Sequence, residues 1–145
     1  MDNFEKLELK YVNGGCSNLA SYFNKKYGWK IFHIVVIEKL LDDEEEDSTD
    51  LERSIPHTLN KLPDGRYFDV YGYQDEKQII SSWRYNLQFT KQTHDFFLCD
   101  ELNCPTDLLK QTACSSDYNQ DMVEKDAEYI LNYYNSNIAS DALEP

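Results

Sequence analysis

Three residues in the first half of the chain have the types that catalysis by a thiol nucleophile requires: Cys16, His57 and Asp69. In such chemistry the cysteine attacks a carbonyl carbon as its thiolate, and an imidazole takes up and returns the proton. A carboxylate then orients the imidazole. Whether these residues can act together depends on the elements that carry them.

Cys16 follows two glycines, Gly14 and Gly15, and opens a run with a helical stripe of apolar residues. The stripe consists of Leu19, Ala20, Phe23 and Tyr27, and it predicts a helix over residues 16–27 that stops at Gly28. The positive end of a helix favours the thiolate, and the Cys16 N–H is a free donor for an oxyanion. A buried structural cysteine is the alternative interpretation.

His57 and Asp69 lie on the two arms of a predicted hairpin, joined by the turn Pro63-Asp64-Gly65. A three-residue turn places Leu59 opposite Asp69 and His57 opposite Tyr71, so that all four side chains share one face. His57 and Asp69 are then diagonal neighbours within reach of a hydrogen bond. A shift of one residue would separate them. The alternative is a surface histidine and a surface aspartate on an ordinary hairpin.

A Gly-Gly-Cys helix start, a strand histidine and an aspartate on the next strand resemble the core of the papain-like cysteine peptidase superfamily, with its transglutaminase-like and NlpC-like branches. The resemblance covers about residues 11–83. The segment from His57 to residue 72 is also similar to small uncharacterised phage and prophage proteins. The resemblance implies Cys16 as nucleophile, His57 as base and acid, and Asp69 as the residue that orients the imidazole.

Two positions depart from that family pattern. Ser17 stands where an aromatic residue often follows the cysteine, and no glutamine precedes Cys16 to supply an oxyanion donor. Asn13 is the best candidate for a substitute amide, and Gly15 is the second candidate for oxyanion or substrate binding.

Composition limits the partners. The 145 residues carry a net charge of −13, which disfavours binding to nucleic acid or to an anionic membrane. The acidity can serve solubility, attract a basic protein partner or imitate nucleic acid. With no signal-like or membrane-spanning run, and four cysteines that suit a reducing compartment, we expect a cytoplasmic protein, or one in the host cytoplasm if it is phage-encoded.

The remaining patterns predict a single α+β domain over residues 1–138. In it a cysteine-bearing N-terminal helix packs on a small antiparallel β-sheet, with peripheral helices that include a C-terminal one. We expect a strand at 29–37, an exposed acidic loop at 42–50 and a flexible tail at 139–145. The other expected elements are a helix at 75–83 capped by Asp75, strand-like alternation at 85–89 and a helix at about 121–137.

A metal site has weak support. His94, Cys99, Cys104 and Cys114 lack the paired spacing of a zinc site, so we expect structural cysteines, no metal and no cofactor. His33 lies in the predicted strand at 29–37, where a core or edge histidine with satisfied hydrogen bonds is the expectation.

Two functions follow from these patterns. The first is a Cys-His-Asp hydrolase or acyl transferase that acts on a peptide, isopeptide or glutamine amide of a protein or peptide substrate through a thioester. The alternative is a non-enzymatic acidic binding protein, such as a phage-encoded inhibitor of a host protein or a nucleic-acid mimic.

Overall fold

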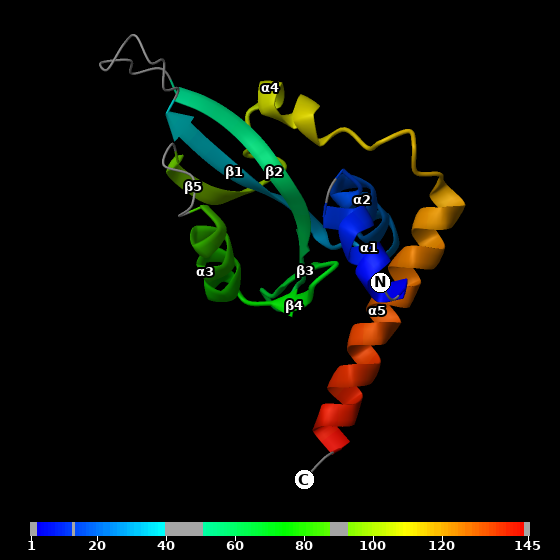
Figure 1. Cartoon of the computed structure of the whole chain (residues 1–145). Helices are drawn as coiled ribbons and strands as arrows, with labels where there is room; N and C mark the ends of the chain where they lie inside the picture. The colour runs from blue at the N-terminus through cyan, green and yellow to red at the C-terminus, as the bar shows by residue number, and fades with distance from the viewer. Residues whose placement is uncertain (1–2, 13, 40–50, 88–92, 144–145) are drawn as a thin grey trace.

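The computed structural model describes residues 3–12, 14–39, 51–87 and 93–143, and within them a five-stranded antiparallel sheet forms the centre of the fold (Figure 1). The strands are β1 (Lys30–Lys39), β2 (Leu51–Lys61), β3 (Tyr67–Asp69), β4 (Gly72–Gln74) and β5 (Thr93–Asp100). Their spatial order is β4-β3-β2-β1-β5. The two long strands β1 and β2 are therefore central, and the short β3 and β4 lie at one side.

Three helices build the core on one face of the sheet. They are α1 (Asn3–Val12), α2 (Cys16–Tyr27) and α5 (Gln120–Leu143). Their apolar side chains meet residues of β3 and of the turn after it. The buried members of this core are Tyr11, Leu19, Phe23, Phe68, Val70, Ala127, Ile130 and Leu131. Burial of this apolar face is what fixes α2, and with it Cys16, against the sheet.

The opposite face is covered by α3 (Glu76–Leu87), which buries Ile79 among alternate residues of β1 and β2 and packs Trp83 against them. A smaller cluster forms where α4 (Thr106–Leu109) and the 3-10 turn η1 (Lys110–Thr112) follow β5. It contains Val35, Cys99, Cys104 and Leu108. Side chains that alternate along β1 thus enter different clusters, as the pleat of a strand requires.

Several predicted elements are confirmed. An α+β fold with a cysteine-bearing helix on an antiparallel sheet and a C-terminal helix is present. The helix of residues 16–27 ends at Gly28, whose left-handed φ of 74° closes it. Asp75 caps α3 reciprocally with Gln78, through bonds of 2.7 and 2.8 Å.

Other expectations need correction. A strand was expected at residues 85–89, but residues 85–87 are helical because α3 continues to Leu87. Residues 88 and 89 lie outside the described ranges. Ile79, Ile80, Trp83 and Leu87 follow one another at helical spacing, and the chain adopts this period rather than the strand-like period of two. Helix α1 has no counterpart in the sequence analysis, and α5 extends to Leu143, into residues assigned to a tail. The acidic loop at 42–50 lies outside the described residues.

Among the helices that the structure describes, none combines the length and the apolar character that crossing a membrane would need.

Candidate functional site

The hairpin register is the one that the Pro63-Asp64-Gly65 turn predicts. Asn60 pairs with Phe68 and Lys61 with Tyr67, and the Leu62 N–H donates to the Arg66 carbonyl at 2.8 Å. Continued by one residue, this register places Leu59 level with Asp69, so the face of β2 that carries His57 is also the face of Asp69. The expectation that Tyr71 lies opposite His57 is wrong, because β3 ends at Asp69 and Tyr71 lies in the turn before β4.

His57 and Asp69 form a buried pair. Nε2 of His57 lies 2.8 Å from Oδ2 of Asp69, and the two side chains are 3% and 8% exposed. Because a carboxylate only accepts, Nε2 carries the proton of this hydrogen bond, and Nδ1 is the ring nitrogen left for another partner. The imidazole is therefore held in one orientation.

The second oxygen of the Asp69 carboxylate is also occupied. Oδ1 accepts from the Tyr71 backbone N–H at 2.8 Å and from Nε2 of Gln74 at 2.9 Å. Both donors come from the tight β3–β4 connection, in which Asp69 pairs with Gly72. Three donors thus fix the position of the carboxylate from both sides.

Cys16 is the first residue of α2, and Gly15 is the N-cap residue. A Cβ atom at Gly15 would lie 2.6 Å from the Lys10 carbonyl oxygen and about 3 Å from the rings of Tyr11 and Tyr118, so only glycine fits between the two helices. The preceding Gly14 has a φ of 100°, which makes the sharp turn from α1 into α2. The glycine pair therefore sets where Cys16 stands.

The thiol of Cys16 meets the imidazole of His57 at the edge of β2. The β2–β3 ladder consists of the pairs at Asn60 and Lys61, which leaves the β2 edge around Thr58 to the start of α2. Burial opposes ionisation of the thiol, yet the pKa of Cys16 is lowered. Hydrogen bonding and charge interaction with His57 outweigh burial, assisted by the backbone N–H groups of Thr58 and Ser17.

The same contacts act on His57 in the opposite direction. Burial would lower its pKa, but the hydrogen bonds and negative charges of Asp69 and Cys16 raise the pKa to about 10. Trp83 from α3 stacks on the imidazole with ring centroids 5.9 Å apart and planes at 28°. The two shifts have the directions that a thiolate beside an imidazolium requires, and the thiolate is the form in which a cysteine is nucleophilic.

The candidate donors to an oxyanion are the Cys16 N–H and the two residues predicted from the sequence, Asn13 and Gly15. The N–H of Cys16 belongs to the first turn of α2, where N–H groups have no partner within the helix. Gly15 is buried and its carbonyl accepts from the Leu19 N–H at 3.1 Å, as the start of the helical ladder. Asn13 lies outside the described residues. Among the described candidates, the Cys16 N–H is the donor best placed for a carbonyl bound at the sulfur.

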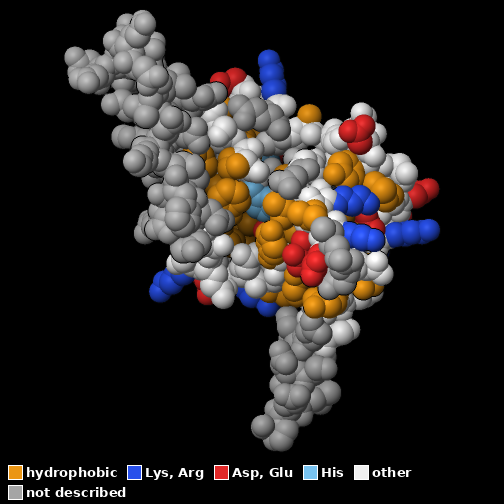
Figure 2. All heavy atoms as spheres, viewed as in Figure 1, with side chains coloured by type: hydrophobic (Ala, Val, Ile, Leu, Met, Phe, Trp, Pro, Cys, Tyr) orange, Lys and Arg blue, Asp and Glu red, His pale blue; other side chains and the backbone are white. Residues whose placement is uncertain are grey.

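The surface over β2 suits an organic substrate. In the view of Figure 2 a histidine side chain is seen in a hollow among hydrophobic side chains, beside the start of α2, and acidic side chains border the hydrophobic area. The half-buried Trp83 stacks on His57, and the exposed Tyr71 follows Asp69 by two residues. Such a surface can hold apolar and cationic groups next to a reacting amide.

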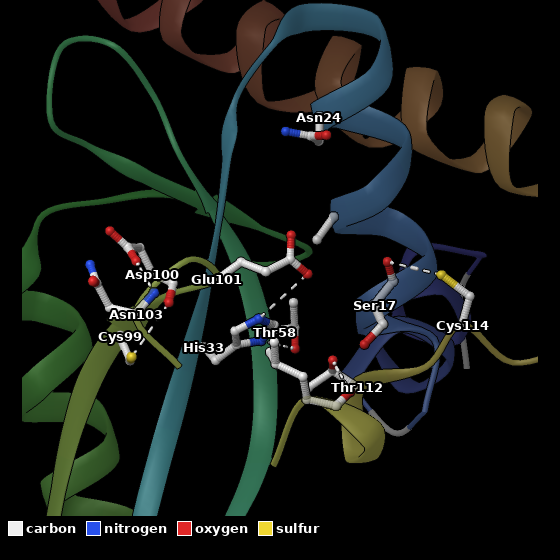
Figure 3. A network of polar contacts seen from close by, with 12 residues as sticks. Ser17, Asn24, His33, Thr58, Cys99, Asp100, Glu101, Asn103, Thr112 and Cys114 are labelled. Atoms are coloured by element: carbon white, nitrogen blue, oxygen red, sulfur yellow. Dashed lines mark hydrogen bonds and ion pairs between the residues drawn. The ribbon is translucent and has the colours of Figure 1, made fainter. Parts of the chain in front are cut away.

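His33 forms a second polar site, on the side of the sheet opposite His57. Its Nδ1 lies 2.9 Å from the Thr58 hydroxyl, between β1 and β2 (Figure 3). Its Nε2 has no hydrogen-bond partner among the described residues and lies 4.0 Å from Oε1 of Glu101. Burial lowers the pKa of His33, so it is a neutral core histidine whose hydrogen bonds are only half satisfied.

The other cysteines do not join Cys16. Cys99 and Cys104 are buried near one another, whereas the exposed Cys114 donates to the Ser17 carbonyl at 3.7 Å (Figure 3). Over the described ranges, no group of three or more His, Cys, Asp or Glu side chains gathers as a metal site would require. The side chain of His94 is outside the described part.

Sequence reasoning missed Gln74 and the role of Tyr71, because the strand β4 was not predicted. Val70 and Tyr71 are unusual residues for a two-residue turn, and the available signal was Gly72, whose φ is 98°. Trp83 packs in the core cluster with Ile79 and also stacks on His57.

Comparison with known proteins returned no match to a family model, a curated protein or a solved structure.

Proposed function

We propose that the protein is a cysteine-dependent hydrolase or acyl transferase that acts on an amide bond of a protein or peptide. Cys16 is the nucleophile, His57 the general base and acid, and Asp69 the residue that orients the imidazole. The observation that supports this most is the chain of contacts from the Cys16 thiol through the His57 ring to the Asp69 carboxylate, with the second bond at 2.8 Å.

The reaction would begin with attack of the Cys16 thiolate on the carbonyl carbon of the amide. The carbonyl π electrons move to oxygen, and the Cys16 N–H donates to the resulting oxyanion. When the oxyanion collapses, the C–N bond breaks and the His57 imidazolium gives its proton to the leaving nitrogen. An amine and a Cys16 thioester result.

The thioester would be resolved by water or by an amine. Neutral His57 takes a proton from the attacking nucleophile while its new bond to the acyl carbon forms. The C–S bond then breaks and the Cys16 thiolate leaves beside the imidazolium, which restores the starting state. Water yields a carboxylate, and an amine yields a new amide, so the class of acceptor decides between hydrolase and transferase.

Two features of the surroundings support this chemistry. The Trp83 ring stacks on the imidazole, and the buried position of the His57 and Asp69 side chains strengthens the hydrogen bond between them. The three donors to the Asp69 carboxylate keep it from turning away. Four free cysteines also suit action in a reducing compartment such as the cytoplasm.

The experiment is turnover of a library of fluorogenic peptide amides, together with capture of an acyl-enzyme by mass spectrometry. We expect the wild type to form a thioester on Cys16, and Cys16→Ala to lose both adduct and turnover while its circular dichroism and melting temperature stay near those of the wild type. Cys114→Ser is the matched control, since its thiol is exposed and bonds to the Ser17 carbonyl. Activity that survives Cys16→Ala would exclude the proposal and leave the acidic binding protein as the alternative.

A further inference from the structure

We infer that Tyr71 and Glu8 form a subsite for a cationic group, an ammonium or guanidinium of a basic peptide side chain, next to Cys16. As a statement about substrate this inference rests on the proposed function. As a statement about binding beside the thiol it is tested independently below.

Tyr71 is tied to the candidate site through its backbone and open to solvent through its ring. Its N–H donates to Oδ1 of Asp69, whose Oδ2 holds His57. Its side chain is 54% exposed, the largest exposure of any aromatic side chain described. The exposed phenol ring therefore belongs to a residue that bonds directly to the carboxylate holding His57, and it is open to a ligand.

Glu8 is placed beside Tyr71 by the packing of α1. One turn earlier on α1, Phe4 packs edge-on against Tyr134, with ring centroids 5.7 Å apart. The Tyr134 hydroxyl donates to the carbonyl of Val70, the residue before Tyr71, at 2.7 Å. Residues four apart share a helix face, so Glu8 projects toward the Val70–Tyr71 turn.

The negative charge of Glu8 raises the pKa values of the tyrosines around this turn. After burial, its carboxylate is the largest cause that raises the pKa of Tyr71, and it also raises the pKa of Tyr134. Among the described residues, no lysine, arginine or histidine forms an ion pair with Glu8. Glu8 is half-buried, so its field is less screened than that of a fully exposed carboxylate.

A cation can interact favourably with the Tyr71 ring and the Glu8 carboxylate at the same time. The face of a phenol ring attracts ammonium and guanidinium ions, and a neighbouring carboxylate adds direct charge attraction. An anionic ligand would meet Glu8 and Asp69 together and be repelled. The net charge of −13 further raises the local concentration of cations before they reach the site. Peptides with a lysine or arginine near the scissile amide are therefore the preferred substrate class.

The test uses small thiol reagents, which report on the surroundings of Cys16 without any turnover. The thiolate attacks the sulfenyl sulfur of a methanethiosulfonate and displaces methanesulfinate, leaving a mixed disulfide. We compare the cationic trimethylammonioethyl reagent with the neutral methyl reagent, in a Cys114→Ser background, with the site assigned by mass spectrometry. The measured quantity is the ratio of the two rates at Cys16.

We expect the cationic reagent to be favoured in the wild type, and Glu8→Gln to reduce the rate ratio about fivefold, as loss of one nearby charge contact implies. Tyr71→Leu reduces the ratio, whereas Tyr71→Phe retains it because the ring remains. Glu124→Gln, which makes the same charge change at an exposed position of α5, is the matched control. Equal ratios in Glu8→Gln and Glu124→Gln would overturn the subsite.

The two proposals fail separately. A ratio that responds to Glu8 and Tyr71, without thioester formation from any peptide amide, leaves the cation subsite in place and removes the amide chemistry. Turnover that shows no preference for lysine or arginine, with a ratio that ignores Glu8, removes the subsite and leaves the amide chemistry.

Discussion

Gln74 donates from its side-chain amide to Oδ1 of Asp69 at 2.9 Å, and so restrains the carboxylate that holds His57. The hydrogen bond comes from β4, a strand of three residues whose first residue pairs with Asp69 itself. The orientation of the imidazole thus depends on a residue that does not touch it. Gln74 is a positioning residue in this arrangement.

Gln74→Ala should weaken the hold on Asp69 without unfolding the protein. Loss of one hydrogen bond to a carboxylate corresponds to about 1.5–3 kcal/mol. We expect a lower pKa of the His57 imidazole, measured by NMR, and slower alkylation of Cys16 at neutral pH. Gln120→Ala, at the exposed start of α5, is the matched control. An unchanged His57 pKa with only a lower melting temperature would assign Gln74 a structural role alone.

The pH profile of kcat/KM should be broad and should respond to Asp69. Activity needs the thiolate and the imidazolium, so it rises through the lowered pKa of Cys16 and falls through the raised pKa of His57, near 10. Asp69→Asn removes a charge that raises the His57 pKa, and the alkaline limb should move to lower pH. An alkaline limb that stays in place in Asp69→Asn would show that the limb reports another group.

Gly72→Ala should destabilise the fold more than Gly65→Ala. Both glycines have a left-handed φ, 98° and 93°, so the backbone strain of an alanine is similar. At Gly72 the added Cβ would lie 2.6 Å from the Tyr134 ring, whereas at Gly65 nothing lies within 4 Å. We expect an extra loss of about 1–3 kcal/mol at Gly72 in urea unfolding, from overpacking. Equal losses at the two positions would show that the ring moves aside at no cost.

Asn60→Ala should loosen α2 from the sheet. The buried Asn60 amide donates to the Ala20 carbonyl at 2.9 Å and thereby ties the cysteine-bearing helix to β2. The variant loses this buried hydrogen bond between α2 and β2, which corresponds to about 0.5–1.5 kcal/mol of unfolding free energy. Asn132→Ala, on the exposed surface of α5, serves as control. If both variants unfold at the same urea concentration, the bond contributes nothing to the position of α2.

The hairpin and α2 were predictable because their signals are local. The Pro63-Asp64-Gly65 turn fixes a register, and Gly28 ends a clear apolar stripe, so both elements follow from neighbouring residues. The end of α3 was ambiguous, since Leu87 fits both a helical and a strand period. Where a short segment fits both periods, its packing in the folded protein determines whether it forms a helix or a strand.

The supports of the candidate site were not predictable for a different reason. Trp83 reaches His57 from α3 on the same face of the sheet, Gln74 reaches Asp69 through a turn with weak sequence signals, and the Thr58 N–H faces Cys16 because β3 is short. Each is a long-range contact or a consequence of strand length, and a periodicity in the sequence does not encode it. The sequence indicated which residue types could react, and the packing determines which of them meet.

The most direct measurement is the pH dependence of iodoacetamide labelling at each of the four thiols, with sites assigned by mass spectrometry, in the wild type and in His57→Gln. In the wild type we expect Cys16 to react fastest of the four at neutral pH, with an apparent pKa below that of an ordinary cysteine thiol. In His57→Gln the pKa of Cys16 should rise and its labelling should slow, while Cys114 is unaffected. A Cys16 that titrates like an ordinary cysteine thiol, or that keeps its pKa in His57→Gln, would contradict the thiolate–imidazolium pair.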